Sequence, residues 1–101
     1  MSKTSRGNYL EKKAEKQLKG QGYWVEKAKR VRFQPVDFWG CWDLIAINQK
    51  EIRFIQVSAV KFYNRSREEK ELLLAFPRPP YTSKEYWYYN KVEKKFKVQK
   101  L

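Results

Sequence analysis

The sequence lacks histidine, contains one cysteine, Cys41, and has no long apolar run. A single cysteine excludes an intramolecular disulfide, and without histidine or a second cysteine a structural zinc site is not expected. No segment reaches the ~18 apolar residues of a membrane-spanning helix, and the first residues carry no apolar signal core. An unpaired cysteine suits a reducing compartment, so we expect an intracellular, cytoplasmic protein with no membrane partner. The abundance of lysine, glutamate and tyrosine suggests a thermophilic archaeal, bacterial or viral source.

Acidic residues are also scarce, since 11 Asp and Glu face 23 Lys and Arg and leave a net charge of +12. The charge is uneven, with a net of +7 over residues 1–34, zero over residues 35–63 and +5 over residues 64–101. Two basic blocks thus flank a neutral centre. Solvated surface lysines, common in heat-adapted proteins, are the plain interpretation. So unbalanced a charge favours a phosphate-binding surface and a nucleic-acid partner.

The first part of the chain predicts a helix and then a strand. Residues 1–5 are expected to form a loose basic arm, and Ser5 or Asn8 to cap a helix that runs to about Lys19. An apolar residue recurs at every fourth position and gives this helix one packing face: Leu10, Ala14 and Leu18. Gly20 and Gly22 end the helix.

The remaining apolar patterns predict a sheet around a second helix. The expected elements are strands at 23–33, 41–47 and 51–60, a helix at 65–74, and a final hairpin of strands 84–89 and 95–100. The strand–helix–strand order after residue 51 favours a parallel crossover. The chain is therefore predicted to be one α/β domain, residues 1–101, with a central mixed β-sheet flanked by helices.

Two polar side chains, Asp43 and Gln56, interrupt the apolar central strands. A buried carboxylate is costly unless it is paired, hydrogen-bonded or bound to a metal. Strand alternation places Gln56 and Ser58 on one face, and a hairpin turning near residues 48–50 brings Asp43 close to one of them. The alternatives are that Asp43 pairs with Arg53 across the hairpin and that Gln56 is a satisfied core amide.

A second carboxylate, Glu11, lies beside the apolar stripe of the first helix. Carboxylate, amide and hydroxyl oxygens suit Mg²⁺ or Mn²⁺ and not zinc. Such a site, ringed by Lys and Arg, is typical of phosphodiester hydrolysis. Glu11 as a plain surface residue remains the alternative, and Asp37, before a glycine-containing turn, is interpreted as a turn residue. Trp39, Trp42, Trp87 and the Tyr86–Tyr89 run are interpreted as core or dimer contacts.

These residues carry a family resemblance. Arg6-Gly7, Glu11, Leu18 and Gly22-Tyr23, followed by Asp43 and Gln56-Val57-Ser58, resemble the archaeal-type Holliday junction resolvases. Those enzymes belong to the PD-(D/E)XK, restriction-endonuclease-like superfamily. The segment 37–47, followed by Gln56-Val57, also looks like a phage-associated branch with glutamine at that position. The resemblance covers about residues 6–62.

The resemblance implies a set of site residues. It gives metal ligands at Glu11, Asp43, Gln56 and the backbone carbonyl of Val57. Gln56 stands in place of the family's second acid, and Ser58 stands where the family has a lysine that stabilises charge on the phosphate. Lys61, three residues on, is the expected substitute for that lysine. The implied catalytic set is Glu11, Asp43, Gln56, Ser58 and Lys61.

The function implied by the resemblance is metal-dependent cleavage of DNA. The expected substrate is branched DNA such as a Holliday junction, the expected cofactor Mg²⁺ or Mn²⁺, and the expected assembly a homodimer built on the C-terminal hairpin or the second helix. The residues expected to contact DNA are Lys3, Arg6, Lys12, Arg30, Arg32, Lys61, Arg65 and Arg67. Two alternatives stay open: a DNA-binding protein of the same fold without catalysis, for which Ser58 argues, and a basic RNA- or ribosome-associated protein.

Overall fold

The computed structural model describes residues 4–28 and 37–101, with side chains from residue 9 onward. The elements, in chain order, are α1 (Thr4–Gly20), β1 (Trp24–Lys27), β2 (Leu44–Ile47), β3 (Ile52–Ser58), a 3-10 turn η1 (Phe62–Asn64), α2 (Arg67–Ala75), β4 (Thr82–Asn90) and β5 (Lys95–Lys100). The order along the sheet is β1-β2-β3-β4-β5. Neighbouring strands pair antiparallel except β3 and β4, which are parallel.

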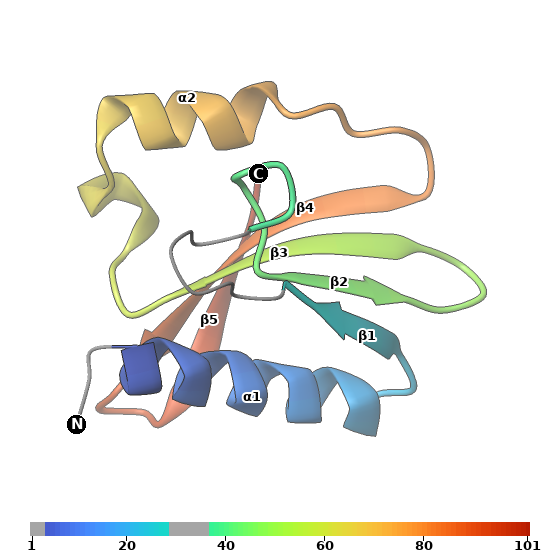
Figure 1. Cartoon of the computed structure of the whole chain (residues 1–101), viewed down its shortest axis with the longest axis horizontal. Helices are drawn as coiled ribbons and strands as arrows, with labels where there is room; N and C mark the ends of the chain where they lie inside the picture. The colour runs from blue at the N-terminus through green and yellow to red at the C-terminus, as the bar shows by residue number, and fades with distance from the viewer. Residues whose placement is uncertain (1–3, 29–36) are drawn as a thin grey trace.

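The predicted α/β architecture with a mixed sheet is confirmed. The parallel β3–β4 pair requires a crossover, and the chain makes it through η1 and α2. Figure 1 shows the sheet between the two helices, with α1 on one side and α2 on the other. Neither described helix is long and apolar enough to cross a membrane.

α1 covers one face of the sheet with the predicted apolar stripe. Leu10, Ala14 and Leu18 are buried and pack on Leu44, Ala46, Ile55, Val57, Trp87 and Phe96. Fully burying a leucine side chain is worth about 1.5–3 kcal/mol, so this stripe fixes the helix on the sheet. The helix ends as predicted at Gly20, and Gly22 turns the chain with a φ of 93° that favours glycine.

α2 covers the other face over a second, aromatic core. Leu73 is buried with Cys41, Trp42 and Tyr86, and Phe54, Phe62, Phe76 and Tyr88 pack against them. Strand alternation explains the two cores, because Ile55 and Val57 face α1 while Phe54 faces α2. The tryptophan and tyrosine at positions 87 and 86 are core residues, as predicted.

Several predicted boundaries are wrong. α1 begins at Thr4, so residues 4 and 5 are helical instead of belonging to a loose arm, and Ser5 and Asn8 lie inside the helix. α2 begins at Arg67, after Ser66, which caps it. Of the predicted strand 23–33, residues 24–27 are strand, and residues 29–36 lie outside the described part of the chain.

The predicted strand 41–47 also starts too early, because regular pairing begins at Leu44. The preceding residues form a tight turn, in which Trp39 and Gly40 have φ angles of 54° and 69° and Phe38 bridges to Trp42. Asp37 accepts the Gly40 N–H through its carbonyl at 3.2 Å, in line with the predicted turn role.

Candidate functional site

β2 is irregular at Asp43, where the site residues begin. In a regular strand the N–H and C=O of one residue point to the same neighbouring strand. At Asp43 the N–H donates to the Ile55 carbonyl at 2.9 Å, while the C=O accepts from Ala28 N–H at 2.9 Å on the other side. Such local irregularities re-aim a side chain and end regular pairing.

The carboxylate of Asp43, instead of a backbone carbonyl, accepts one of the backbone N–H groups of β3. Its Oδ2 accepts the backbone N–H of Val57 at 2.8 Å, and the side chain is buried. A carboxylate has two oxygens with about four lone-pair directions, so it can accept an N–H and bind a cation at the same time. Asp43 therefore reaches β3 between Gln56 and Ser58, which confirms that the hairpin brings it close to them.

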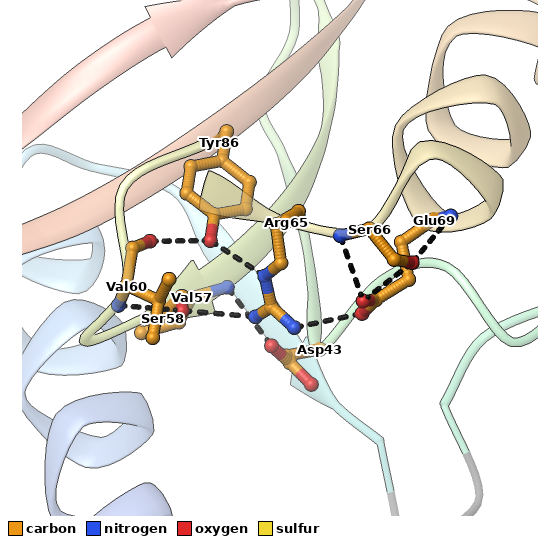
Figure 2. A network of polar contacts seen from close by, with 8 residues as sticks. All are labelled: Asp43, Val57, Ser58, Val60, Arg65, Ser66, Glu69 and Tyr86. Carbon is orange, nitrogen blue, oxygen red and sulfur yellow. Dashed lines mark hydrogen bonds and ion pairs between the residues drawn. The ribbon is translucent and has the colours of Figure 1, made fainter. Parts of the chain in front are cut away.

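The hydroxyl of Ser58 is hydrogen-bonded to the guanidinium of Arg65. The buried Ser58 Oγ accepts hydrogen bonds from Arg65 Nη2 and from the Val60 N–H, each at 2.9 Å. Figure 2 shows the guanidinium between the end of β3 and the start of α2, with Ser58 on one side and Glu69 on the other. Arg65 thus supplies a positive charge next to Ser58, which itself has none.

Arg65 is held by further contacts. Its Nε donates to Tyr86 Oη at 2.8 Å and its Nη1 to Glu69 Oε2 at 2.8 Å, while the Tyr86 hydroxyl donates to the Val60 carbonyl. Burial would lower the pKa of the guanidinium, but the bonds to Tyr86 and Glu69 outweigh it and raise that pKa. The charge is therefore permanent and its position is fixed from three sides.

Glu69 completes the network. It forms a capping box with Ser66, in which Ser66 Oγ accepts the Glu69 N–H and the Glu69 carboxylate accepts the Ser66 N–H. Hydrogen bonds from Ser66, and then the charge of Arg65, lower the pKa of this carboxyl. The start of α2 thus positions the guanidinium.

A small cleft opens beside this network on the α2 side of the sheet. We call it the Gln56 cleft, and its volume is ≈ 140 Å³. It is lined by Asp37, Gly40, Cys41, Gln56, Arg65, Glu69, Leu72 and Leu73. An amide, a guanidinium and two carboxylates share a space the size of a hydrated ion or a phosphate group. The Cys41 thiol in its wall is buried, and burial, followed by the charge of Asp37, raises its pKa.

Comparison of the chain with protein-family models, with curated proteins and with solved structures gave no match.

The predicted substitute lysine lies elsewhere. The Lys61 ammonium is 5.9 Å from the ring centroids of both Tyr63 and Tyr88. It lines a separate hollow, and Lys61 is not among the residues around the Gln56 cleft. Sequence reasoning missed Arg65 in this role. The available signal was the Ser66-x-x-Glu69 capping pattern, which starts a helix directly after Arg65.

The structure gives the position of Glu11 and of the other predicted metal ligands. Glu11 is buried on α1, so the alternative that it is a plain surface residue is wrong. Within residues 9–28 and 37–101, no group of three or more His, Cys, Asp or Glu side chains that could hold a metal ion is present. The other predicted oxygen donors, the amide of Gln56 and the backbone carbonyl of Val57, belong to β3, whose Val57 N–H donates to Asp43.

The alternative in which Asp43 pairs with Arg53 is wrong, because Arg53 pairs with Glu85 of β4. Its Nε and Nη2 donate to the two carboxylate oxygens of Glu85 at 2.8 and 2.6 Å. β3 places Arg53 on the α1 side, beside the rings of Tyr23 and Trp87.

The predicted DNA-contacting residues lie on more than one surface. Lys12 is exposed on α1, whereas Arg67 is exposed on α2, on the opposite side of the sheet. Arg65 is partly buried in its network instead of lying on the surface. Lys3, Arg30 and Arg32 fall outside the described residues, as does the side chain of Arg6.

Proposed function

We propose that this protein is a metal-dependent endonuclease that hydrolyses DNA phosphodiester bonds, with branched DNA such as a four-way junction as its substrate. One observation carries the proposal: the Arg65 guanidinium lies 2.9 Å from Ser58 Oγ, one residue beyond the Val57 N–H that Asp43 holds. A fixed cation beside a buried carboxylate and an amide is the charge arrangement that phosphoryl chemistry needs.

Each residue has a role in this proposal. Asp43, Gln56 and the Val57 carbonyl hold the divalent ion, with Glu11 as a further candidate ligand. When bound, Mg²⁺ or Mn²⁺ supplies charge neutralisation at the phosphate and an activated water. Arg65 stabilises the negative charge that builds on the phosphate oxygens, and Ser58 orients the guanidinium. Arginine suits this role because its charge persists and its N–H groups are directional.

The oxygen donors of the proposed site are of the kind that Mg²⁺ and Mn²⁺ bind. Asp43 and Gln56 offer oxygen atoms and a single negative charge, and magnesium sites commonly use one or two carboxylates together with substrate phosphates and water. We therefore expect weak ion binding by the free protein and tighter binding when DNA is present.

Strand cleavage tests the proposal directly. A labelled four-way junction and a matched linear duplex are incubated with the protein in Mg²⁺, in Mn²⁺ or in EDTA. We expect metal-dependent nicking of the junction that Asp43→Asn abolishes and that Arg65→Ala lowers at least 100-fold in rate, the usual effect of removing one transition-state donor.

Arg67→Ala is the matched control. It removes the same charge at a position two residues from Arg65, where the side chain is exposed and pairs with Glu71. It should weaken DNA binding slightly and leave the rate at saturating DNA unchanged. Full cleavage by Asp43→Asn, or equal rate losses in the Arg65 and Arg67 variants, would show that this network is not the active site.

A DNA-binding protein without catalysis is the second candidate. The observation in its favour is that Arg65 already bonds to Ser58, Tyr86 and Glu69, so the network holds itself together without substrate. Tight junction binding in Mn²⁺ with no nicking would select this candidate over the nuclease.

A further inference from the structure

A second hollow lies near the Arg65 network. We call it the tyrosine hollow; its volume is ≈ 430 Å³ and its walls include Lys61, Tyr63, Tyr86, Tyr88, Lys97 and Gln99. Its residues come from η1 and the segment before it, from β4 and from β5. Three tyrosine rings, two lysines and an amide therefore surround a space large enough for a small planar ligand.

Tyr86 connects this hollow to the proposed active site. Tyr86 is one of the residues that line the hollow, and its hydroxyl accepts the hydrogen bond from Arg65 Nε. Arg65 in turn lines the Gln56 cleft. A nucleic-acid strand whose phosphate reaches Arg65 thus has the tyrosine hollow next to it, within the reach of a neighbouring nucleotide.

The chemistry of the walls suits a nucleotide. Tyr63 is largely exposed and Tyr88 half-buried, and the Lys61 ammonium lies over both rings, 5.9 Å from each ring centroid. Base–tyrosine stacking binds any base, because every base has a π face. Lys61 and Lys97 supply positive charge for a phosphate, and the Gln99 amide can donate to or accept from a base edge.

The charge around the hollow favours an anionic ligand. The chain carries a net charge of +12, and two lysines line the hollow against Glu93, which already pairs with Lys95 and Lys97. An aromatic ligand that also carries negative charge fits these walls best. A base inside an intact duplex is stacked on both sides, so its ring is not available to tyrosine.

We propose that the tyrosine hollow binds one unpaired nucleotide, with its base on Tyr63 or Tyr88 and its phosphate near Lys61 and Lys97. The inference rests on the proposed function for the identity of the substrate and adds to it a preference for unpaired DNA beside the cleaved bond.

Binding in EDTA tests this inference without cleavage. The double variant Tyr63→Leu/Lys61→Gln removes an accessible ring and its ammonium. The matched control is Tyr9→Leu/Lys13→Gln on α1, where Lys13 Nζ lies 5.7 Å from the Tyr9 ring centroid. We expect the first pair to weaken binding of a single-stranded oligonucleotide about tenfold or more and the control pair to weaken it less than threefold, since loss of one base–aromatic stack lowers affinity by about this factor.

A photo-crosslink locates the base. A single strand with one 5-iodouracil should crosslink to Tyr63 or Tyr88, identified by mass spectrometry of the digested protein. Equal losses in the two double variants, or a crosslink that forms at Trp24 or Tyr81 instead, would overturn the inference. If nicking of the junction fails while the Tyr63 and Lys61 effect is present, the proposed nuclease function falls and the nucleotide site stands.

Discussion

Glu85 shows how single residues hold the sheet around the site. Its carboxylate is 1% exposed and accepts hydrogen bonds from Arg53, from Ser83 Oγ at 2.6 Å and from Trp87 Nε1 at 2.9 Å. Burial raises the pKa of this carboxyl, but the donors, Arg53 first, outweigh it and set the pKa below its ordinary value of 4.5. A buried, fully bonded ion pair of this kind ties β3 to β4.

Glu85→Gln is expected to destabilise the fold by about 3 kcal/mol, because it leaves the Arg53 charge partly buried and without its carboxylate. Urea unfolding at pH 7 measures this loss. The pKa of Glu85 is lower in the folded state than in the unfolded chain, so its contribution is present above about pH 4.5 and disappears as the pH falls through the folded pKa. The unfolding free energy of the parent protein should therefore fall more steeply below pH 4.5 than that of Glu85→Gln. Parallel pH curves for the two proteins would contradict the assignment.

For single residues, the sequence predicted which side chains are buried better than it predicted which groups they bond to. The apolar neighbours of Asp43 predicted a buried carboxylate near Gln56 and Ser58, and the structure confirms it. The choice of Arg53 as a possible partner failed, because strand alternation turns Arg53 toward the face that Glu85 shares. The cation that bonds to Ser58 depends on the path of the chain after β3, and the capping pattern Ser66-x-x-Glu69 predicts only where the next helix begins.

α2 is held at both ends by side chains. Ser66 and Glu69 cap its start. At its end, the buried Lys84 of β4 donates from Nζ to the carbonyls of Leu73, Leu74 and Phe76 at 3.0, 2.7 and 2.9 Å. These carbonyls have no partner within the helix, and an ammonium also suits the negative end of the helix dipole. The lysine therefore anchors α2 over β4.

Lys84→Met is expected to lower the unfolding free energy by about 2–3 kcal/mol, because hydrogen bonds to a charged group are lost and buried carbonyls remain. Lys100→Met on the exposed β5 is the control and should change stability by less than about 0.5 kcal/mol. Hydrogen exchange of the α2 amides should speed up in the first variant alone. Unchanged stability of Lys84→Met would show that water replaces the ammonium without loss.

The elements themselves were largely predictable. Four-residue spacing predicted α1, and apolar patterns predicted β3 and the β4–β5 hairpin to within a few residues. The error at β2 arose because Cys41 and Trp42 look like strand residues, whereas they follow the left-handed turn at Trp39 and Gly40. The side chains of Cys41 and Trp42 pack in the core under α2, and this packing depends on the tertiary structure, which a local sequence pattern does not reveal.

At the scale of the whole molecule, several large apolar side chains are exposed. Leu72 and Leu74 on α2 are 51% and 53% exposed, and Val92 at the β4–β5 turn is 92% exposed. Symmetric cutting of a four-way junction needs two active sites, so we propose that the protein forms a homodimer through α2.

Sedimentation equilibrium tests the dimer with two matched substitutions. Leu74→Lys is expected to produce monomers and to abolish paired cuts on opposite strands while single nicks persist. Val92→Lys introduces the same side chain at the hairpin and should leave the dimer intact. Dissociation by Val92→Lys alone would move the interface to the hairpin, and a monomeric parent protein at the concentrations used for cleavage would refute the homodimer.

The parallel β3–β4 pair also determines when the site comes into being as the chain folds. β2–β3 and β4–β5 are joined by short turns, whereas β3 and β4 are joined through η1 and α2 and close a long loop. Contacts across long loops form late, since the entropy of closure must be overcome first. Arg65 bonds to Ser58 on β3 and to Tyr86 on β4, so the guanidinium reaches its place only when this last contact closes. A nascent or partly unfolded chain therefore carries Asp43 and Gln56 without their cation. Pulsed hydrogen exchange during refolding should accordingly protect the amides that join β2 to β3 before those that join β3 to β4.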